Sequence, residues 1–372
     1  MRLDPLAIAN PGVRGLRPYE PGKPLEALAR EYGIRDAVKL ASNENPLGPS
    51  PKALEAVRAG VAGLARYPEG NGFALKQALA ANTGVAVEQV TLGNGSNEVL
   101  ELVARTFAGP ANEVIFSEHA FVVYALVTQA IGARAVATPA RAWGHDLEAM
   151  TAAVNARTRL IFIANPNNPT GTWLTAGDLK AFIAGLPEQV LVVVDEAYFE
   201  YVAEPDYPDC SRWLAEHPNL IVTRTFSKVY GLAGLRMGYA LSSPTIAELL
   251  NRVRQPFNVN SLALRAAEAA LGDEAHLRES VAANGEGMRQ LTQAFSELGL
   301  AYIPSVANFV SLELGRSAAQ VYEALLHEGV IVRPVANYGM PRHLRVTVGT
   351  AVENRRFIEA LKKVLAKHAL GT

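Results

Sequence analysis

Residues 220–238, with the sequence LIVTRTFSKVYGLAGLRMG, join an apolar run to a polar, glycine-rich segment. The run Leu220–Thr223 is typical of a buried strand, and Lys228 follows soon after its end. Open α/β sheets bind ligands beyond the carboxyl ends of their strands, so Lys228 is a candidate chemical group. Arg236 is near enough in the chain to bring a second cation to the same anion. Taken alone, the stretch also fits a solvated lysine and a surface ion pair.

Three glycines of this stretch, Gly231, Gly234 and Gly238, would let the backbone approach a bound anion closely. A lysine amine forms Schiff bases once its pKa is lowered, and a nearby cation is one cause of such a lowering. A phosphate site, an imine-forming amine and a cation together suggest pyridoxal phosphate as the cofactor.

Length and composition limit the class of protein. The chain has 372 residues, of which 49% are hydrophobic, and this predicts a large domain with a smaller one. Its 35 basic and 36 acidic side chains nearly balance, so the chain lacks the excess of positive charge that is typical of a nucleic-acid binder. The single cysteine, Cys210, rules out an internal disulfide framework and disfavours a cysteine-based metal site. Neither a signal peptide nor a membrane-spanning run is recognisable, so we expect a cytoplasmic protein with no membrane or nucleic-acid partner and no metal.

The strongest predicted strand is the apolar run 190–194, which is followed by Asp195. A continuous apolar run is typical of a strand buried on both faces, and its alternation with helices predicts a doubly wound, parallel sheet. Asp195 is a natural partner for a pyridine nitrogen, because a carboxylate there keeps the nitrogen protonated. Tyr198 could reach the phenolic oxygen of the same ring. The simpler alternatives are a turn-capping acid for Asp195 and ordinary packing for Tyr198.

A second anion site is predicted where residues 90–98 join a short strand to a helix that begins near Ser96. A glycine-rich turn at a helix start presents free backbone N–H groups and the positive end of the helix dipole. Short turns of this kind are common, so the pattern is weak by itself.

The chain from residue 302 onward alternates short strands and helices in an α+β pattern. Arg345 falls within an apolar strand there, an expensive place for a guanidinium unless it meets a carboxylate. Arg333 ends another short strand, where a surface ion pair is equally plausible. We expect an N-terminal arm with part of the small domain at 1–45, a large domain at 46–272 and a small domain at 273–372. One helix, Leu25–Tyr32, is expected in the arm.

Several motifs occur together in the order and local spacing found in one superfamily. They are Asn168-Pro-Thr-Gly171, Asp195 with Tyr198, Thr225-x-Ser227-Lys228 with Arg236, and Arg345. In these motifs the chain resembles the fold-type I pyridoxal-phosphate aminotransferases of class I/II along essentially its whole length. Within that superfamily, segments 40–48, 66–68, 228–236 and 344–349 resemble those of the histidinol-phosphate aminotransferases. The resemblance implies a large α/β domain with a mostly parallel seven-stranded sheet between helices, and a smaller α+β domain.

The same resemblance implies catalytic roles for Lys228, Asp195 and Tyr198. Lys228 would form the internal aldimine with the cofactor and then shuttle the proton between two carbons. Asp195 would pair with the pyridinium nitrogen, while Tyr198 and Asn168 would hydrogen-bond the ring oxygen. Phe121 falls where the family stacks an aromatic side chain on the ring.

The cofactor phosphate would be bound by residues of three segments. They are Gly95, Ser96, Asn97, Thr225, Ser227 and Arg236. The resemblance also implies that Tyr67 reaches the phosphate of the neighbouring subunit's cofactor, so the active unit would be a homodimer.

For the substrate, the resemblance implies that Arg345 binds the phosphate of histidinol phosphate, together with Arg333, Tyr19 and Asn43. 2-Oxoglutarate would use the same cations in the second half of a ping-pong transamination of histidine biosynthesis. Aromatic amino-acid aminotransferases and phosphothreonine decarboxylases share similar patterns and stay open as alternatives. A ligand-sensing regulator with this fold is a third possibility, but it would need a DNA-binding segment for which the chain has no spare length.

Overall fold

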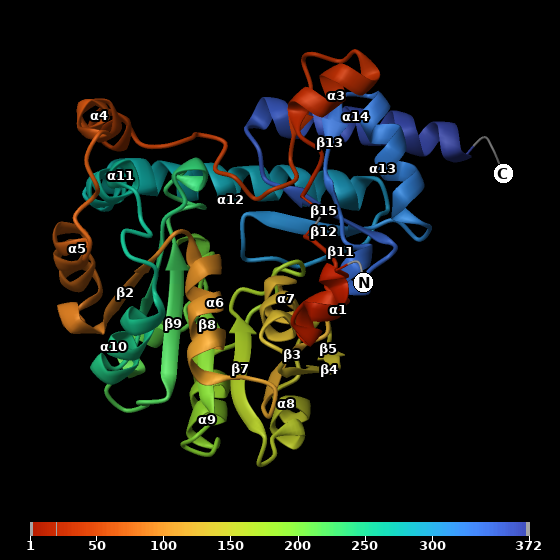
Figure 1. Cartoon of the computed structure of the whole chain (residues 1–372). Coiled ribbons are helices and arrows are strands. Elements are labelled where there is room, and N and C mark those ends of the chain that lie inside the picture. The colour runs from red at the N-terminus through yellow and green to blue at the C-terminus, as the bar shows by residue number, and fades with distance from the viewer. Residues whose placement is uncertain (1–2, 20, 370–372) are drawn as a thin grey trace.

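The computed structural model describes residues 3–19 and 21–369, which form two lobes, each built on its own sheet (Figure 1). The large sheet has seven strands in the spatial order β2-β10-β9-β8-β7-β3-β4. Only β10 runs antiparallel to its neighbours, so the mostly parallel seven-stranded sheet predicted from the sequence is confirmed. Its strands are β2 (Val90–Gly93), β3 (Glu113–Ser117), β4 (Arg134–Thr138), β7 (Thr158–Ala164), β8 (Leu191–Asp195), β9 (Leu220–Thr225) and β10 (Gly238–Leu241).

The central strands β8 and β9 are buried on both faces. Val193 of β8 packs into the core on one face of the sheet, while Val192 and Val194 pack into the core on the other. This follows from strand geometry, because successive side chains point to opposite faces. A strand that is hydrophobic throughout therefore requires helices on both sides of the sheet.

Helices supply that cover on both faces (Figure 1). On the face of Val193 lie α6 (Ser96–Phe107), α7 (Val123–Ala130) and α10 (Pro244–Val253). The opposite face is covered by α5 (Phe73–Thr83), α8 (Leu147–Ala153), α9 (Ala176–Ala184) and α11 (Ser261–Leu271), with α4 (Pro51–Gly60) packed on α11.

The second lobe contains a four-stranded antiparallel sheet in the order β11-β12-β15-β14. The helix α12 (Glu274–Glu297) runs from the large lobe into this one (Figure 1). Near the N-terminus, β1 pairs in parallel with β13, which attaches the start of the chain to the second lobe. The exact domain limits at 45/46 and 272/273 stay predictions. The other elements here are α3 (Leu25–Tyr32), β1 (Val38–Lys39), β11 (Tyr302–Ile303), β12 (Phe309–Glu313), α13 (Ala318–His327), β13 (Val330–Ile331), β14 (Arg333–Pro334), β15 (His343–Thr347) and α14 (Ala351–Ala369).

The N-terminal arm differs from the prediction of a single helix. Two further short helices, α1 (Pro5–Ile8) and α2 (Pro11–Arg14), precede α3. Their prolines occupy first-turn positions, where the missing N–H costs nothing, and Asp4 and Asn10 accept hydrogen bonds as N-caps. The prediction of a single helix in the arm was therefore wrong.

Short elements complete the chain, and the sequence did not predict them. The strands β5 (Ala140–Arg141) and β6 (Gly144–His145) form a separate two-stranded antiparallel hairpin. In the part of the chain that the structure describes, no helix is both long and apolar enough to cross a bilayer. The 3₁₀ helices are η1 (Val61–Gly63), η2 (Val87–Gln89), η3 (Phe199–Tyr201), η4 (Cys210–Trp213), η5 (Ala233–Leu235) and η6 (Ala336–Tyr338).

A buried ion pair ties the ends of β8 and β9 together. Arg224 donates through Nε and Nη2 to one oxygen of Glu196, at 2.9 and 2.7 Å, and through Nη2 to Asp209 at 2.7 Å. The guanidinium also lies 3.6 Å from the ring centre of Phe199. The side chains of Arg224 and Glu196 are 5% and 0% exposed, so each buried charge depends on the other for its stabilisation.

Replacing Arg224 with methionine should leave Glu196 buried without its cation and lower the free energy of unfolding by about 3–5 kcal/mol. Arg252 forms an exposed pair with Glu248 and provides the control. Its methionine variant should change stability by no more than about 0.5 kcal/mol. Urea denaturation of both variants measures the difference, and equal losses would contradict the importance of the buried pair.

Candidate active site

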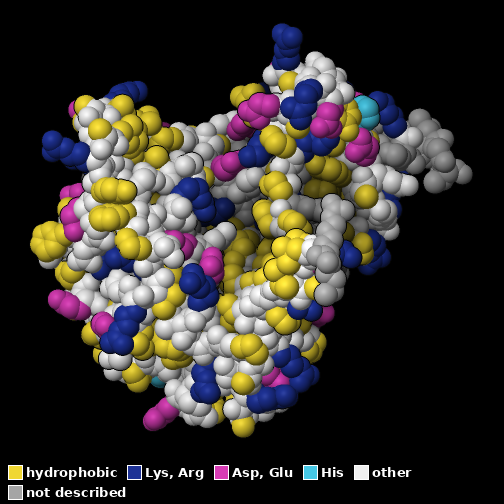
Figure 2. Space-filling model, in the orientation of Figure 1, with side chains coloured by type: hydrophobic (Ala, Val, Ile, Leu, Met, Phe, Trp, Pro, Cys, Tyr) yellow, Lys and Arg dark blue, Asp and Glu magenta, His cyan; other side chains and the backbone are white. Residues whose placement is uncertain are grey.

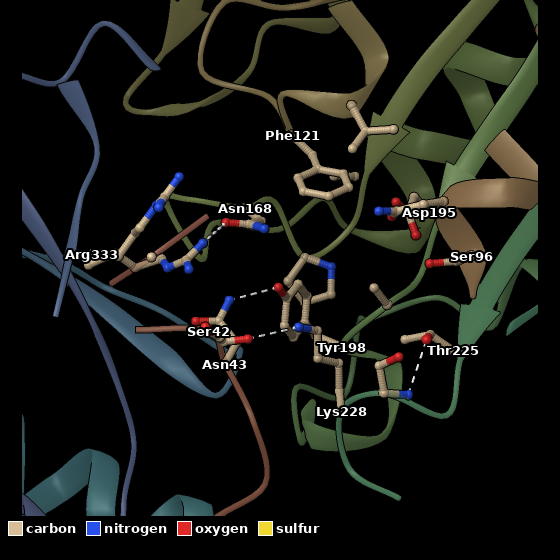
Figure 3. Close-up of a pocket in the computed structure, with 18 of the residues that line it drawn as sticks. Ser42, Asn43, Ser96, Phe121, Asn168, Asp195, Tyr198, Thr225, Lys228 and Arg333 are labelled. Carbon is tan, nitrogen blue, oxygen red and sulfur yellow. Dashed lines mark hydrogen bonds between the residues drawn. The ribbon is translucent and has the colours of Figure 1, made fainter. Parts of the chain in front are cut away.

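A cavity of about 320 Å³ lies between the edge of the large sheet and the second lobe (Figure 3). In the space-filling view the molecule is hollowed between the two lobes (Figure 2). All the site residues predicted from the sequence line this cavity except Gly95 and Tyr67. The predicted residues that line it are Tyr19, Asn43, Ser96, Asn97, Phe121, Asn168, Asp195, Tyr198, Thr225, Ser227, Lys228, Arg236, Arg333 and Arg345.

Lys228 follows β9 and extends its amine into the cavity (Figure 3). Its Nζ donates to the backbone oxygen of Ser42 at 3.2 Å and lies 5.6 Å from the ring centre of Tyr198. Desolvation, followed by the nearby Arg345 guanidinium, lowers the pKa of Lys228 from 10.5 to about 7. A substantial fraction of the amine is therefore unprotonated near neutral pH, as a nucleophile or base requires.

Asp195 is the last residue of β8 and is only 4% exposed. Burial raises the pKa of its carboxyl group, whereas hydrogen bonds from Tyr124 and Thr223 act in the opposite direction. The Tyr124 hydroxyl donates to Oδ2 at 2.9 Å, and the Thr223 hydroxyl donates to Oδ1 at 3.0 Å. Because Asp195 also lines the cavity, it can accept a further hydrogen bond from a protonated ligand nitrogen.

An anion-binding corner lies at the start of α6, where the helix N-terminus meets Arg236. Gly95 precedes the helix with φ of +83°, and a Cβ there would lie 2.5 Å from Nη2 of Arg236. The Arg236 Nη1 is 3.5 Å from the hydroxyl oxygen of Ser227. Helix N–H groups, hydroxyls and a guanidinium together form a site suited to a phosphate.

The three glycines near Lys228 have different surroundings. A Cβ on Gly238 would lie 2.2 Å from the backbone nitrogen of Ser96, so this glycine lets β10 pack directly against the anion-binding turn. Gly231 instead lies against the backbone of Gly48, and a Cβ on Gly234 would meet no described atom within 4 Å. Only Gly238 is thus packed against the anion-binding turn, and the expected close approach of Gly231 and Gly234 to an anion stays a prediction.

Arg345 projects from β15 toward the same cavity and is only 6% exposed. Its Nη1 donates to Oδ1 of Asn168 at 2.6 Å, and its Nη2 donates to the backbone oxygen of Ala41 at 2.8 Å. Within residues 3–19 and 21–369, Nε has no hydrogen-bond partner and no ion pair is formed at Arg345. The carboxylate partner expected from the sequence is thus not found in the described chain, and a ligand anion would supply it.

Arg333 and Tyr198 complete the wall around Arg345. Arg333 is paired with Arg345 across β14 and β15, and its guanidinium lies 5.7 Å from the ring centre of Tyr19. The hydroxyl of Tyr198 accepts a hydrogen bond from Asn43 Nδ2 at 2.8 Å. Burial raises the pKa of Tyr198 to about 12, so it stays a protonated donor at neutral pH.

Tyr67 lies apart from this cavity. Its side chain is 82% exposed and stacks on Phe257 with ring centres 4.8 Å apart. A single chain does not bring Tyr67 to its own Lys228, and its predicted contact with a neighbouring subunit stays a prediction.

Comparisons with known proteins agree with this geometry. Residues 35–361 match the family described as aminotransferase class I and II. A histidinol-phosphate aminotransferase of Pseudomonas fluorescens is 62% identical over 366 residues, covering 98% of this chain and 99% of the relative. Another, from Nitrosococcus oceani, is 60% identical and covers 96% and 97%. The chain belongs to the histidinol-phosphate aminotransferase family of class I and II aminotransferases.

A solved structure supports the same family. The crystal structure of histidinol-phosphate aminotransferase from Sinorhizobium meliloti, in complex with pyridoxal-5'-phosphate, superposes with a TM-score of 0.91. The two proteins are 31% identical, and the match covers 97% of this aminotransferase and 98% of the other. The fold-type I architecture predicted from the sequence is confirmed.

Sequence reasoning missed several residues of this aminotransferase site, among them Tyr124, Thr223, Ser42 and Tyr338. Thr223 carried a usable signal, because it is a hydroxyl residue two positions before Thr225, and residues at this spacing in a strand share one face. Tyr124 carried a weaker signal, since a tyrosine in an apolar helix usually only packs in the core. Ser42 contributes a backbone oxygen, which no sequence pattern reveals.

The lowered pKa of Lys228 predicts a pH-dependent stability of the cofactor-free protein. Between about pH 7 and pH 10.5, the unfolded chain binds a proton at this lysine that the folded chain does not bind. The free energy of unfolding of the wild type should therefore rise with pH across this window, relative to that of Lys228→Met. Urea titrations at several pH values test this, and a difference that stays constant with pH would contradict it.

Proposed function

We propose that the protein catalyses the pyridoxal-phosphate-dependent transamination of L-histidinol phosphate with 2-oxoglutarate, giving imidazole-acetol phosphate and glutamate in histidine biosynthesis. The observation that carries this proposal is the placement of Lys228, Asp195 and an anion-binding corner around one cavity in a chain of this family. The 60–62% identity to named histidinol-phosphate aminotransferases supports the substrate. We further propose that the reaction takes place in the cytoplasm.

The cavity lining fits pyridoxal phosphate at each of its polar groups. Lys228 would bond to the aldehyde carbon through Nζ, and Asp195 would accept from the ring nitrogen. Phe121, which points into the cavity, would cover the ring face (Figure 3). The phosphate would lie at the α6 N-terminus, among Ser96, Asn97, Gly95, Thr225, Ser227 and Arg236. When bound, the cofactor supplies an electron sink for the charge that develops at the substrate's amine-bearing carbon.

Lys228 is the residue best placed to move the proton during each half-reaction. Once free, its Nζ would remove the proton from the amine-bearing carbon of the substrate and carry it to a second carbon. Its lowered pKa favours this role, because the amine is partly unprotonated near neutral pH. The Tyr198 hydroxyl, positioned by Asn43, and the Asn168 amide would donate to the ring oxygen.

The second lobe would bind the substrate's distal anion. The buried guanidinium of Arg345, which forms no ion pair among the described residues, favours an anion at this position, and Arg333, Tyr19 and Asn43 lie on the same wall. A guanidinium can donate two parallel hydrogen bonds to a phosphate or to a carboxylate. Histidinol phosphate and 2-oxoglutarate can therefore bind to the same cations in turn. This shared use favours a ping-pong reaction.

A substrate panel tests the proposed reaction. L-histidinol phosphate and glutamate, added separately to the cofactor-loaded enzyme, should each change the cofactor's absorbance from that of its aldehyde form to that of its amine form in a single turnover. Phenylalanine should react at least about tenfold more slowly, because it offers Arg345 and Arg333 a single carboxylate, whereas histidinol phosphate offers a doubly charged phosphate and glutamate offers two carboxylates. Stopped-flow absorbance measures all three. A strong preference for phenylalanine would favour the aromatic aminotransferase alternative, and carbon dioxide release from phosphothreonine would favour the decarboxylase.

We also propose that the active unit is a homodimer in which Tyr67 reaches the cofactor phosphate of the partner. The exposure of Tyr67 supports this, because the hydroxyl lies outside the cavity of its own chain. Loss of that hydroxyl in Tyr67→Phe should weaken cofactor binding roughly tenfold, as expected for one hydrogen bond to a charged group.

Hybrid dimers distinguish contact across the interface from contact within one chain. Lys228→Ala should be inactive, and Tyr67→Phe should bind the cofactor weakly. If Tyr67 acts across the interface, a hybrid of the two variants contains one site with both native residues. Co-refolded mixtures should then regain activity at low cofactor concentration, and mixtures no more active than Tyr67→Phe alone would contradict the proposal.

A further inference from the structure

Tyr124 is a buried residue of α7 that contacts two cofactor-facing side chains without lining the cavity itself. It is fully buried, and its ring stacks on Phe162 with centres 4.8 Å apart and an angle of 5° between the rings. Its hydroxyl donates to Oδ2 of Asp195 at 2.9 Å. Phe121 meets the same ring edge-on at 5.8 Å and 90°. One side chain thus supports both the acid and the aromatic ring that face the cavity.

The two oxygens of Asp195 are held by different elements of the large lobe. Tyr124 reaches Oδ2 from α7, and Thr223 reaches Oδ1 from β9. Two donors fix the plane of the carboxylate and leave its cavity-facing lone pairs for a ligand. Both donors also stabilise the charged form, which burial otherwise disfavours. The titratable groups that face Asp195 are Tyr124 from α7, Lys228 after β9 and Tyr198 after β8.

We infer that Tyr124 is a positioning residue for the cofactor ring: its hydroxyl holds the carboxylate of Asp195 aimed at the ring nitrogen, and its ring sets the tilt of Phe121. The inference rests on the proposed function, since it requires that a pyridine nitrogen meets Asp195. It assigns Tyr124 no contact with the substrate or the cofactor. The residue acts only through Asp195 and Phe121.

The variant Tyr124→Phe isolates the hydroxyl. Phenylalanine keeps the stack on Phe162 and the edge contact with Phe121, so only the hydrogen bond to Asp195 is lost. Thr128, one turn further along α7, offers a matched control. It is fully buried, and its hydroxyl donates to the backbone oxygen of Tyr124 at 2.7 Å. Thr128→Val also removes a buried hydroxyl from α7 but leaves the bond to Asp195 intact.

The experiment compares two probes on the cofactor-free full-length chain. One is pyridoxal phosphate, and the other is its 1-deaza analogue, in which a C–H group replaces the ring nitrogen. The wild type and Thr128→Val should both bind pyridoxal phosphate more tightly than the analogue. In Tyr124→Phe that preference should fall roughly tenfold, because a carboxylate that is no longer held toward the ring nitrogen discriminates less between N–H and C–H. Affinity for the analogue should be nearly unchanged.

Nitrogen-15 NMR of the labelled ring nitrogen provides a readout that a purely structural role of Tyr124 would not move. In Tyr124→Phe, the pH at which the bound nitrogen loses its proton should fall by about one unit relative to wild type. Thr128→Val should titrate as the wild type does.

The outcomes separate this inference from the proposed function. If the wild type binds both probes equally, the ring nitrogen does not meet Asp195, and the proposed function and the inference fail together. If the wild type discriminates and Tyr124→Phe discriminates equally well with the same titration, only the role of Tyr124 fails. A loss of discrimination in Thr128→Val of the same size as in Tyr124→Phe would also overturn it, since packing of α7 would then be the cause.

Discussion

The parallel pairing of β8 with β9 is the constraint on which the rest of the site depends. It sets Asp195 opposite Thr223, so that a hydroxyl reaches the carboxylate from the neighbouring strand. Lys228 follows the end of the same β9, which brings the amine and the acid to one edge of the sheet. A register slip of one residue would turn Asp195 to the opposite face and exchange it with Glu196. The hydrophobic packing of both faces, together with the Arg224 ion pair, prevents that slip.

The remaining parts of the site are added around this edge by segments distant in sequence. The antiparallel strand β10 returns beside β2 and holds Gly238 against the start of α6, which completes the anion-binding corner. The second lobe contributes Arg345 and Arg333 from adjacent strands. Each lobe therefore provides one cationic region. The space between them suits a cofactor whose phosphate lies at the large lobe and a substrate whose anion lies at the second lobe.

Much of the fold could be predicted because the relevant signals are local. The apolar run before Asp195 and the one before Lys228 both form central strands, since each is short, continuous and followed by polar residues. Many residues of the cavity could be predicted because their motifs match those of a known family, and Asp195 and Lys228 also because they follow apolar strand runs. The support of Asp195 by Tyr124 could not, because it joins residues 71 positions apart through tertiary packing. The environment of Arg345 was misjudged for the same reason: Asn168 and Ala41 come from distant segments.

The hydrogen bond between Arg345 and Asn168 has a consequence for selectivity among anions. An incoming ligand competes with an amide oxygen that already occupies one corner of the guanidinium, so its affinity reflects the exchange and not the full attraction between opposite charges. A ligand with two suitably spaced oxygens could accept from Nη1 and Nη2 together and replace both the amide and the backbone oxygen of Ala41, whereas a monatomic ion could replace only one of them. The proposed anion site at Arg345 would thus discriminate by shape: chloride and similar ions would gain little from it, although they carry the required sign of charge.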